Sequence, residues 1–316
     1  MRTLPACHTT TSECIVIETP DLEQFCNKHR LPNSFPAYAK QWFDPVVAEI
    51  AAYQKASGPA CIGVSGCQGS GKSTFADYCA LVLEQQFNLN CAVLSLDDLY
   101  LTKAQRAQLG ADVHPLFATR GVPGTHDTEL GKALIHTLKQ GSSAVELPIF
   151  DKLSDDRSAQ TTSCHPAVDI VLFEGWCLGA TAQAEDALRS PCNSLESSQD
   201  PEGIWRAYAN EQLRQEYDSL FSAVDYWIML KAPSFEQVFK WRLEQEQKLV
   251  AAQHAAGNTQ VTGMLEDEVR FFIAHYQRIT EHLLKTLPGK VNYLLELDES
   301  RQIYQASRPV PVELDN

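Results

Sequence analysis

The sequence lacks the features of several protein classes. No apolar run approaches the ~20 residues that a membrane-spanning helix needs, and the first thirty residues contain no hydrophobic core of a signal peptide. Basic residues are in the minority, because 26 Lys and Arg stand against 40 Asp and Glu, a formal net charge of −14. A duplex nucleic acid requires a basic face. We therefore expect no membrane or nucleic-acid partner, and a cytoplasmic location.

Cysteine is present without the spacing of a metal site. The ten cysteines form no C-x-x-C pair and no Cys/His ligand pattern, and Cys61, Cys79 and Cys91 lie in apolar segments. We interpret them as reduced thiols in the core, without structural zinc. The hydrophobic content of 44% is that of a globular protein, and 316 residues predict one enlarged domain or a core with appendages.

A phosphate-binding loop is the strongest signal that is present. Residues 66–73 match G-x-x-x-x-G-K-[ST] at every fixed position, after the apolar residues 61–64 and before a helical stretch. A simple Gly/Ser-rich turn would not need the Lys-Ser pair. Backbone amides of such a loop converge on one anion, Lys72 reaches the outer phosphates and Ser73 can hold Mg²⁺. We predict that ATP is bound by Gly66, Gln68, Gly69, Ser70, Gly71, Lys72, Ser73 and Thr74.

The chain alternates short apolar runs with helical stretches. This alternation predicts an α/β fold, a parallel sheet with helices on both faces. Residues 1–59 are predicted to form a mostly helical extension, with a helix over residues 36–55, and residues 60–316 the main domain. The main domain would include a substrate-binding excursion at residues 101–165 and a lid at about 234–264. The predicted strands are residues 61–65, 91–96, 169–173, 226–230 and 291–297.

Carboxylates follow two of these strands. Asp97 and Asp98 follow the second strand, at the sheet edge where open α/β folds bind ligands. Asp97 is a candidate base for an acceptor hydroxyl, whereas Asp98 either caps the next turn or contacts the substrate. Glu174 ends the third strand and is a candidate contact for Mg²⁺. Its alternative is a solvated side chain at the strand end.

Charged residues in the excursion and the lid are weaker signals. Arg120, Lys152 and Arg157 lie near Asp127 in sequence, which suits a pocket for a small hydroxylated acid, although solvated loop charges fit the spacing too. His126 is either a site residue or a structural histidine. Arg242 is a candidate lid cation that stabilises a transferring phosphate, and its alternative is a charged helix surface.

Several runs together resemble the D-glycerate 3-kinase family, within the uridine kinase and phosphoribulokinase-like P-loop kinases. Besides the phosphate loop, they are S-L-D-D-L-Y at residues 95–100, H-P-L at 114–116, R-G-V-P-G-T-H-D at 120–127, F-D-K at 150–152, E-G-W-C at 174–177, and W-R with Q-E within 241–246. The resemblance implies five parallel strands in the order 2-3-1-4-5. It also implies Asp97 as the base and Glu174 as the Mg²⁺-linked carboxylate. Predicted substrate-binding residues are Asp98, Tyr100, Arg120, His126, Asp127, Lys152 and Arg157.

The activity implied by the resemblance is ATP-dependent phosphorylation of D-glycerate, on its 3-hydroxyl. Two alternatives stay open at this point: a kinase for another small alcohol, such as a nucleoside or pantothenate, and a nucleotide-driven regulator or metallochaperone that phosphorylates no substrate. Against the second, the sequence has Glu174-Gly175 where a switch GTPase has D-x-x-G, and no N-K-x-D motif. Nothing in the sequence indicates the oligomeric state.

Overall fold

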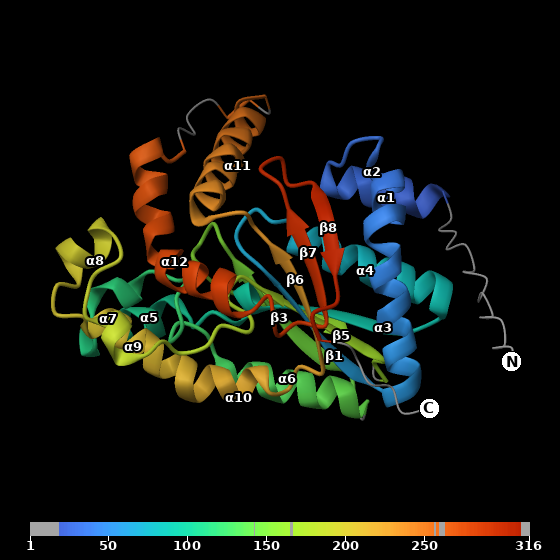
Figure 1. The fold of residues 1–316 in the computed structure, drawn as a ribbon, viewed down its shortest axis with the longest axis horizontal. Coiled ribbons are helices and arrows are strands. Elements are labelled where there is room, and N and C mark those ends of the chain that lie inside the picture. Colours follow the sequence, from blue (N-terminus) through green and yellow to red (C-terminus); the bar gives the residue numbers. More distant parts are fainter. Residues whose placement is uncertain (1–18, 142, 165–166, 256, 259–262, 311–316) are drawn as a thin grey trace, which may run out of the picture.

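A six-stranded sheet in the order β2-β5-β1-β6-β7-β8 forms the centre of the computed structural model (Figure 1). The model describes residues 19–141, 143–164, 167–255, 257–258 and 263–310. The strands are β1 (Ala60–Gly66), β2 (Cys91–Ser95), β5 (Ile170–Gly175), β6 (Tyr226–Lys231), β7 (Tyr293–Leu297) and β8 (Ile303–Ser307). The first five pair in parallel, whereas β8 is antiparallel to β7.

The α/β prediction is confirmed, and the five predicted strands stand in the predicted order. The five parallel strands are confirmed, but the predicted sheet lacked a sixth strand, because β8 adds an antiparallel edge. Three central residues of β8 are exposed, so the strand has no apolar run to mark it in the sequence. By contrast, β1 and β5 are buried at every position, as strands covered on both faces are.

Helices cover the sheet on both faces. In Figure 1, α3 (Asp44–Ser57) and α4 (Lys72–Phe87) lie to the right of the strands, and α6 (Thr128–Gln140) and α10 (Asp218–Phe221) lie below them. Smaller elements form the left side of the view. They are α5 (Lys103–Asp112), the 3₁₀ helix η2 (Pro115–Ala118), α7 (Glu185–Leu188), α8 (Ser194–Gln199), α9 (Ile204–Gln212) and the π-helix η3 (Leu213–Tyr217).

Two further parts lie near the carboxyl ends of the strands. The excursion contains an antiparallel hairpin of β3 (Val145–Asp151) and β4 (Asp156–Cys164), and residues 142 and 165 lie outside the described residues. The predicted lid corresponds to α11 (Phe235–Ala255), which packs against α12 (Glu266–Thr286). Residues 256 and 259–262 of that region are also outside the described residues.

The described part of the N-terminal segment consists of α1 (Thr19–His29), α2 (Phe35–Trp42) and α3. The helical stretch predicted over residues 36–55 is confirmed, but it is divided, because α2 ends before Phe43 and α3 begins at Asp44-Pro45. Proline lacks an N–H and favours the first turn of a new helix. Phe25 and Phe43 lie in the same hydrophobic core as the central strands. The division of the chain at residue 59 stays a prediction.

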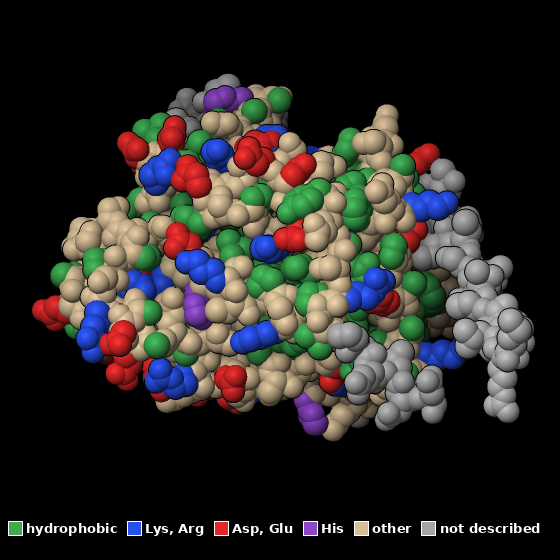
Figure 2. Space-filling view, viewed as in Figure 1, with side chains coloured by type: hydrophobic (Ala, Val, Ile, Leu, Met, Phe, Trp, Pro, Cys, Tyr) green, Lys and Arg blue, Asp and Glu red, His purple; other side chains and the backbone are tan. Residues whose placement is uncertain are grey.

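The described helices include none that is long and apolar enough to cross a bilayer. On the face shown in Figure 2, Lys and Arg side chains are interspersed with Asp and Glu. This face therefore presents no broad field of one sign.

Candidate active site

The phosphate loop joins β1 to α4, as its sequence predicts. Gly69 and Gly71 have φ angles of +78° and +87°, a region that other residues rarely adopt, and Gly71 caps the N-terminus of α4. A Cβ on Gly71 would meet no atom within 4 Å, so the backbone faces open space there. The loop thus presents backbone amides and a helix N-terminus to one concave surface, the arrangement that binds phosphate.

Glu174 lies beside this loop because β5 runs parallel to β1. Its carboxylate accepts hydrogen bonds from Ser73 Oγ at 3.0 Å and from Ser95 Oγ at 2.8 Å, and Lys72 Nζ lies 3.5 Å from its other oxygen. Glu174 is only 5% exposed, which excludes the alternative of a solvated strand end. Burial alone would lower the pKa of Lys72, but the carboxylates of Glu174 and Asp97 outweigh it and raise that pKa. Lys72 is therefore a cation at neutral pH.

The residues predicted to hold Mg²⁺ fit that ion. A hydroxyl and a carboxylate stand together at the start of α4, and Glu174 Oε2 is buried without a hydrogen-bond partner. Hard oxygen ligands of this kind are what Mg²⁺ takes, and it usually binds through one or two carboxylates plus substrate phosphates. Ser73 and Glu174 would therefore supply the protein oxygens.

Asp97 and Asp98 point to different partners. Strand β2 ends at Ser95, one residue earlier than predicted, and the next residues form the 3₁₀ helix η1 (Leu96–Leu99). Asp97 pairs with Lys152 Nζ at 2.9 Å, whereas Asp98 accepts a hydrogen bond from the backbone N–H of Phe150 at 2.9 Å. Burial would raise the pKa of Asp97, but Lys152 and Lys72 lower it to about 2. Burial raises the pKa of Asp98.

One cleft of about 490 Å³ brings most of the predicted residues together. Helices α11 and α12 also contribute to its lining. Predicted residues that line this cleft are Gln68, Gly69, Gly71, Lys72, Ser73, Thr74, Asp97, Tyr100, Arg120, Lys152 and Arg242. This cleft, which we call the acceptor cleft, is therefore lined by four cations and by the carboxylates of Asp97 and Glu246.

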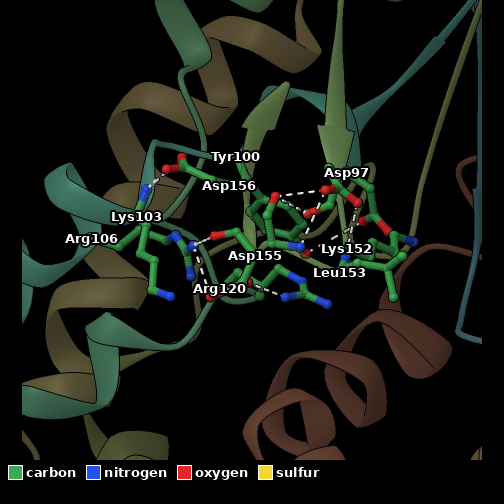
Figure 3. A network of polar contacts seen from close by, with 12 residues as sticks. Asp97, Tyr100, Lys103, Arg106, Arg120, Lys152, Leu153, Asp155 and Asp156 are labelled. Atoms are coloured by element: carbon green, nitrogen blue, oxygen red, sulfur yellow. Dashed lines mark hydrogen bonds and ion pairs between the residues drawn. The ribbon is translucent and has the colours of Figure 1, made fainter. Parts of the chain in front are cut away.

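The turn between β3 and β4 is held at both ends by ion pairs (Figure 3). At one end of the turn, Lys152 pairs with Asp97. At the other, the Asp155 carboxylate bridges two guanidinium groups, because it pairs with Arg120 and lies 3.1 Å from Arg106. Arg106 is fully buried and also donates to the backbone oxygen of Asp155 at 2.5 Å. The turn is thus attached to the wall that carries Arg120.

Four predicted substrate residues lie behind the cleft lining. Asp98 holds β3, and Asp127 caps α6 by accepting from Leu130 N–H at 3.0 Å. Arg157 donates to Tyr100 O at 3.0 Å. His126 is 5% exposed and stacks on Tyr100, with ring centroids 4.3 Å apart. Arg157 and His126 thus contact the lining residue Tyr100, whereas Asp98 and Asp127 hold β3 and α6. Direct contact of these four residues with an acceptor stays a prediction.

Arg242 lies on α11 and faces the acceptor cleft. It pairs with Glu246 Oε2 at 2.8 Å, one turn along the helix, and its guanidinium lies 5.6 Å from the ring centre of Phe272. These contacts hold a cation at the cleft, as a lid residue requires, although they also occur in a charged helix surface. The catalytic role of Arg242 stays a prediction.

Sequence reasoning assigned no role to several residues of the lining. Tyr276 on α12 donates to the backbone oxygen of Arg120 at 3.3 Å and packs edge-on against Trp176. A Cβ on Gly121 would come within 2.7 Å of the Tyr276 hydroxyl, so glycine is required beside Arg120. The R-G-V-P-G-T-H-D run contains Gly121, but nothing in the sequence indicates that it packs against Tyr276, 155 residues away. The other unassigned lining residues are Gln245, Glu246, Leu249 and Phe272.

Known proteins resemble this chain over most of its length. No family model matches it. A protein named an uncharacterized kinase from Schizosaccharomyces pombe is 34% identical over 260 residues, covering 77% of this chain and 89% of the relative. The chloroplastic D-glycerate 3-kinase of Arabidopsis thaliana is 28% identical over 77% of this chain, and the match spans 53% of that protein.

A solved structure agrees with these matches. D-glycerate 3-kinase from Cryptococcus neoformans superimposes with a TM-score of 0.67 and 26% sequence identity, over 83% of this chain and 96% of that one. The chain belongs to the D-glycerate 3-kinase family of P-loop kinases.

Proposed function

We propose that this kinase transfers the γ-phosphoryl group of ATP to the 3-hydroxyl of D-glycerate, giving 3-phosphoglycerate and ADP. One observation carries the choice of acceptor: Asp97 faces the phosphate loop in a cleft that also holds Arg120 and Lys152. The carboxylate suits a hydroxyl, and the cations suit the carboxylate of an acid. Two similar proteins named D-glycerate 3-kinase, from Arabidopsis thaliana and Cryptococcus neoformans, support the same acceptor.

The roles of the residues follow from their positions. Lys72 and the loop amides neutralise phosphate charge, and Mg²⁺ held by Ser73 and Glu174 supplies further neutralisation when bound. Asp97 orients the acceptor hydroxyl and accepts its proton. The guanidinium of Arg120 binds the acceptor carboxylate through paired N–H donors, and Arg242 approaches the transferring group from α11. Phosphoryl transfer requires little more from a protein than this positioning and charge.

The test is an assay of ATP consumption with Mg²⁺ and one candidate acceptor at a time: D-glycerate, glycerol, a nucleoside, pantothenate, or none. Among these acceptors, we expect only D-glycerate to support turnover. We expect the NMR spectrum of the product to place the phosphate on the 3-hydroxyl. Turnover with a nucleoside or pantothenate would show that the protein is a kinase with a different acceptor. ATP hydrolysis that no acceptor stimulates would favour a nucleotide-driven regulator. A cytoplasmic location stays a prediction.

A further inference from the structure

The turn between β3 and β4 carries a lysine that occupies the proposed catalytic base. Lys152 Nζ lies 2.9 Å from Asp97 Oδ2 (Figure 3), and the Tyr100 hydroxyl donates to Asp97 Oδ1 at 3.4 Å. Both carboxylate oxygens of Asp97 therefore already have a donor. An attacking hydroxyl competes with these donors, and a carboxylate that is paired with an ammonium takes up a proton less readily.

The two ends of this turn differ in how firmly they are held. At one end, Asp155 pairs with Arg120 and with Arg106, which is fully buried. Inside the turn, the Asp151 carboxylate accepts hydrogen bonds from two backbone N–H groups, at 3.0 and 3.2 Å. At the other end, the Lys152 side chain is 62% exposed, and an ion pair so exposed contributes little to stability. The ammonium can therefore change partners while the turn keeps its place.

We infer that Lys152 makes phosphoryl transfer depend on an acceptor that carries a carboxylate. Without an acceptor, the ammonium stays on Asp97 and water is a poor substitute. A carboxylate bound at Arg120 offers the ammonium a second anionic partner in the same cleft, so Lys152 exchanges partners and releases the base. Water and neutral alcohols offer no such partner. The inference rests on the proposed function, in which Asp97 is the base and the acceptor is an acid.

Transfer and hydrolysis compete for the same base. In transfer, the acceptor oxygen forms a bond to the γ-phosphorus, the bond from that phosphorus to the β–γ bridging oxygen breaks, and the hydroxyl proton passes to Asp97. The products are ADP and the phosphorylated acceptor. In hydrolysis, a water oxygen forms the new bond and a water proton passes to Asp97, so the products are ADP and inorganic phosphate. A lysine that occupies Asp97 until the acceptor binds therefore suppresses hydrolysis and spares transfer.

Three variants isolate this contact. Lys152→Met removes the charge and keeps an unbranched side chain of similar length. Lys103→Met is the matched control, because Lys103 is exposed, does not line the acceptor cleft, and contacts Asp156 of the hairpin through its backbone N–H. The double variant Asp97→Asn with Lys152→Met tests whether any effect passes through Asp97. Thermal melts verify that all three variants fold.

The first measurement is the release of inorganic phosphate from ATP with Mg²⁺ and no acceptor. We expect Lys152→Met to hydrolyse ATP about fivefold faster than the parent, which corresponds to the roughly 1 kcal/mol of an exposed ion pair. Lys103→Met should match the parent, and the double variant should show no rise. A rate for Lys152→Met no higher than the parental rate would overturn the inference. A rise that persists in the double variant would also overturn it, because the effect would not involve Asp97.

The second measurement uses D-lactate, which has the carboxylate and the 2-hydroxyl of D-glycerate but no 3-hydroxyl. D-lactate should stimulate ATP hydrolysis by the parent, because its carboxylate draws Lys152 away from Asp97, and should stimulate Lys152→Met less. Absence of stimulation in a parent that phosphorylates D-glycerate would overturn the inference. A parent that does not phosphorylate D-glycerate would refute the proposed function instead, and the hydrolysis rates without acceptor would still decide the role of Lys152.

Discussion

Replacing Asp97 by Asn tests the chemical role of the carboxylate with little change in shape. Asn is nearly isosteric and retains one oxygen acceptor, but it cannot take the hydroxyl proton. General base catalysis contributes about 10²- to 10⁴-fold in rate, or about 2.7 to 5.4 kcal/mol of barrier. We expect kcat to fall by roughly 10² or more, with ATP affinity retained, because Lys72 keeps Glu174 as its carboxylate partner.

The same substitution should change stability little. The ion pair that Asp97 loses is with Lys152, whose side chain is 62% exposed. Exposed pairs contribute at most about 1 kcal/mol, which in a chain of 316 residues shifts Tm by about 1–2 °C. If the variant is folded and its kcat is low, the loss of kcat therefore comes from the chemical step and not from unfolding.

The assay is steady-state kinetics of parent, Asp97→Asn and Asp98→Asn on D-glycerate, with ATP affinity measured by calorimetry. Asp98→Asn is the matched control, since Asp98 binds the backbone of Phe150 and Asn can still accept that hydrogen bond. A larger kcat loss in Asp98→Asn than in Asp97→Asn would refute the assignment of the base.

Three further predictions follow from the site and its surroundings. Lys72→Ala should abolish turnover while circular dichroism shows a native fold, and near-normal turnover by a folded variant would contradict the kinase function. Arg120→Lys should raise KM for D-glycerate strongly and KM for ATP little, because an ammonium cannot reproduce the two parallel N–H bonds of a guanidinium, and glycerol should be a very poor acceptor for the parent. Comparable turnover of glycerol and glycerate would show that Arg120 does not bind a carboxylate. His126→Gln should reduce the fall in Tm between pH 7 and pH 5. Burial lowers the pKa of His126 to about 3, so below about pH 6.5 the unfolded chain takes up the proton and stability falls, by up to about 2 kcal/mol at pH 5. An equal fall in Tm for parent and variant would exclude this effect.

The sequence alone determined the features that depend on neighbouring residues. The phosphate loop needs glycines and a Lys-Ser pair at fixed spacing, and its strand and helix follow directly on either side. Buried parallel strands read as short apolar runs, so the five strands and the carboxylates after two of them were predictable. The edge strand β8 was not, because its mostly exposed residues carry no apolar run.

Only the tertiary structure decided which charges meet and which surfaces enclose a space. Asp155 pairs with Arg106 and Arg120, which are distant from it in the sequence. The packing of the hairpin turn brings these three residues together. Tyr276 reaches the backbone of Arg120 from a helix far along the chain. Residues within 29–38 and the turn after β7 together line a cavity of about 400 Å³ beside the phosphate loop. Such contacts depend on how distant elements pack, and local spacing carries no signal for them because in the sequence either partner alone is an ordinary polar or apolar residue.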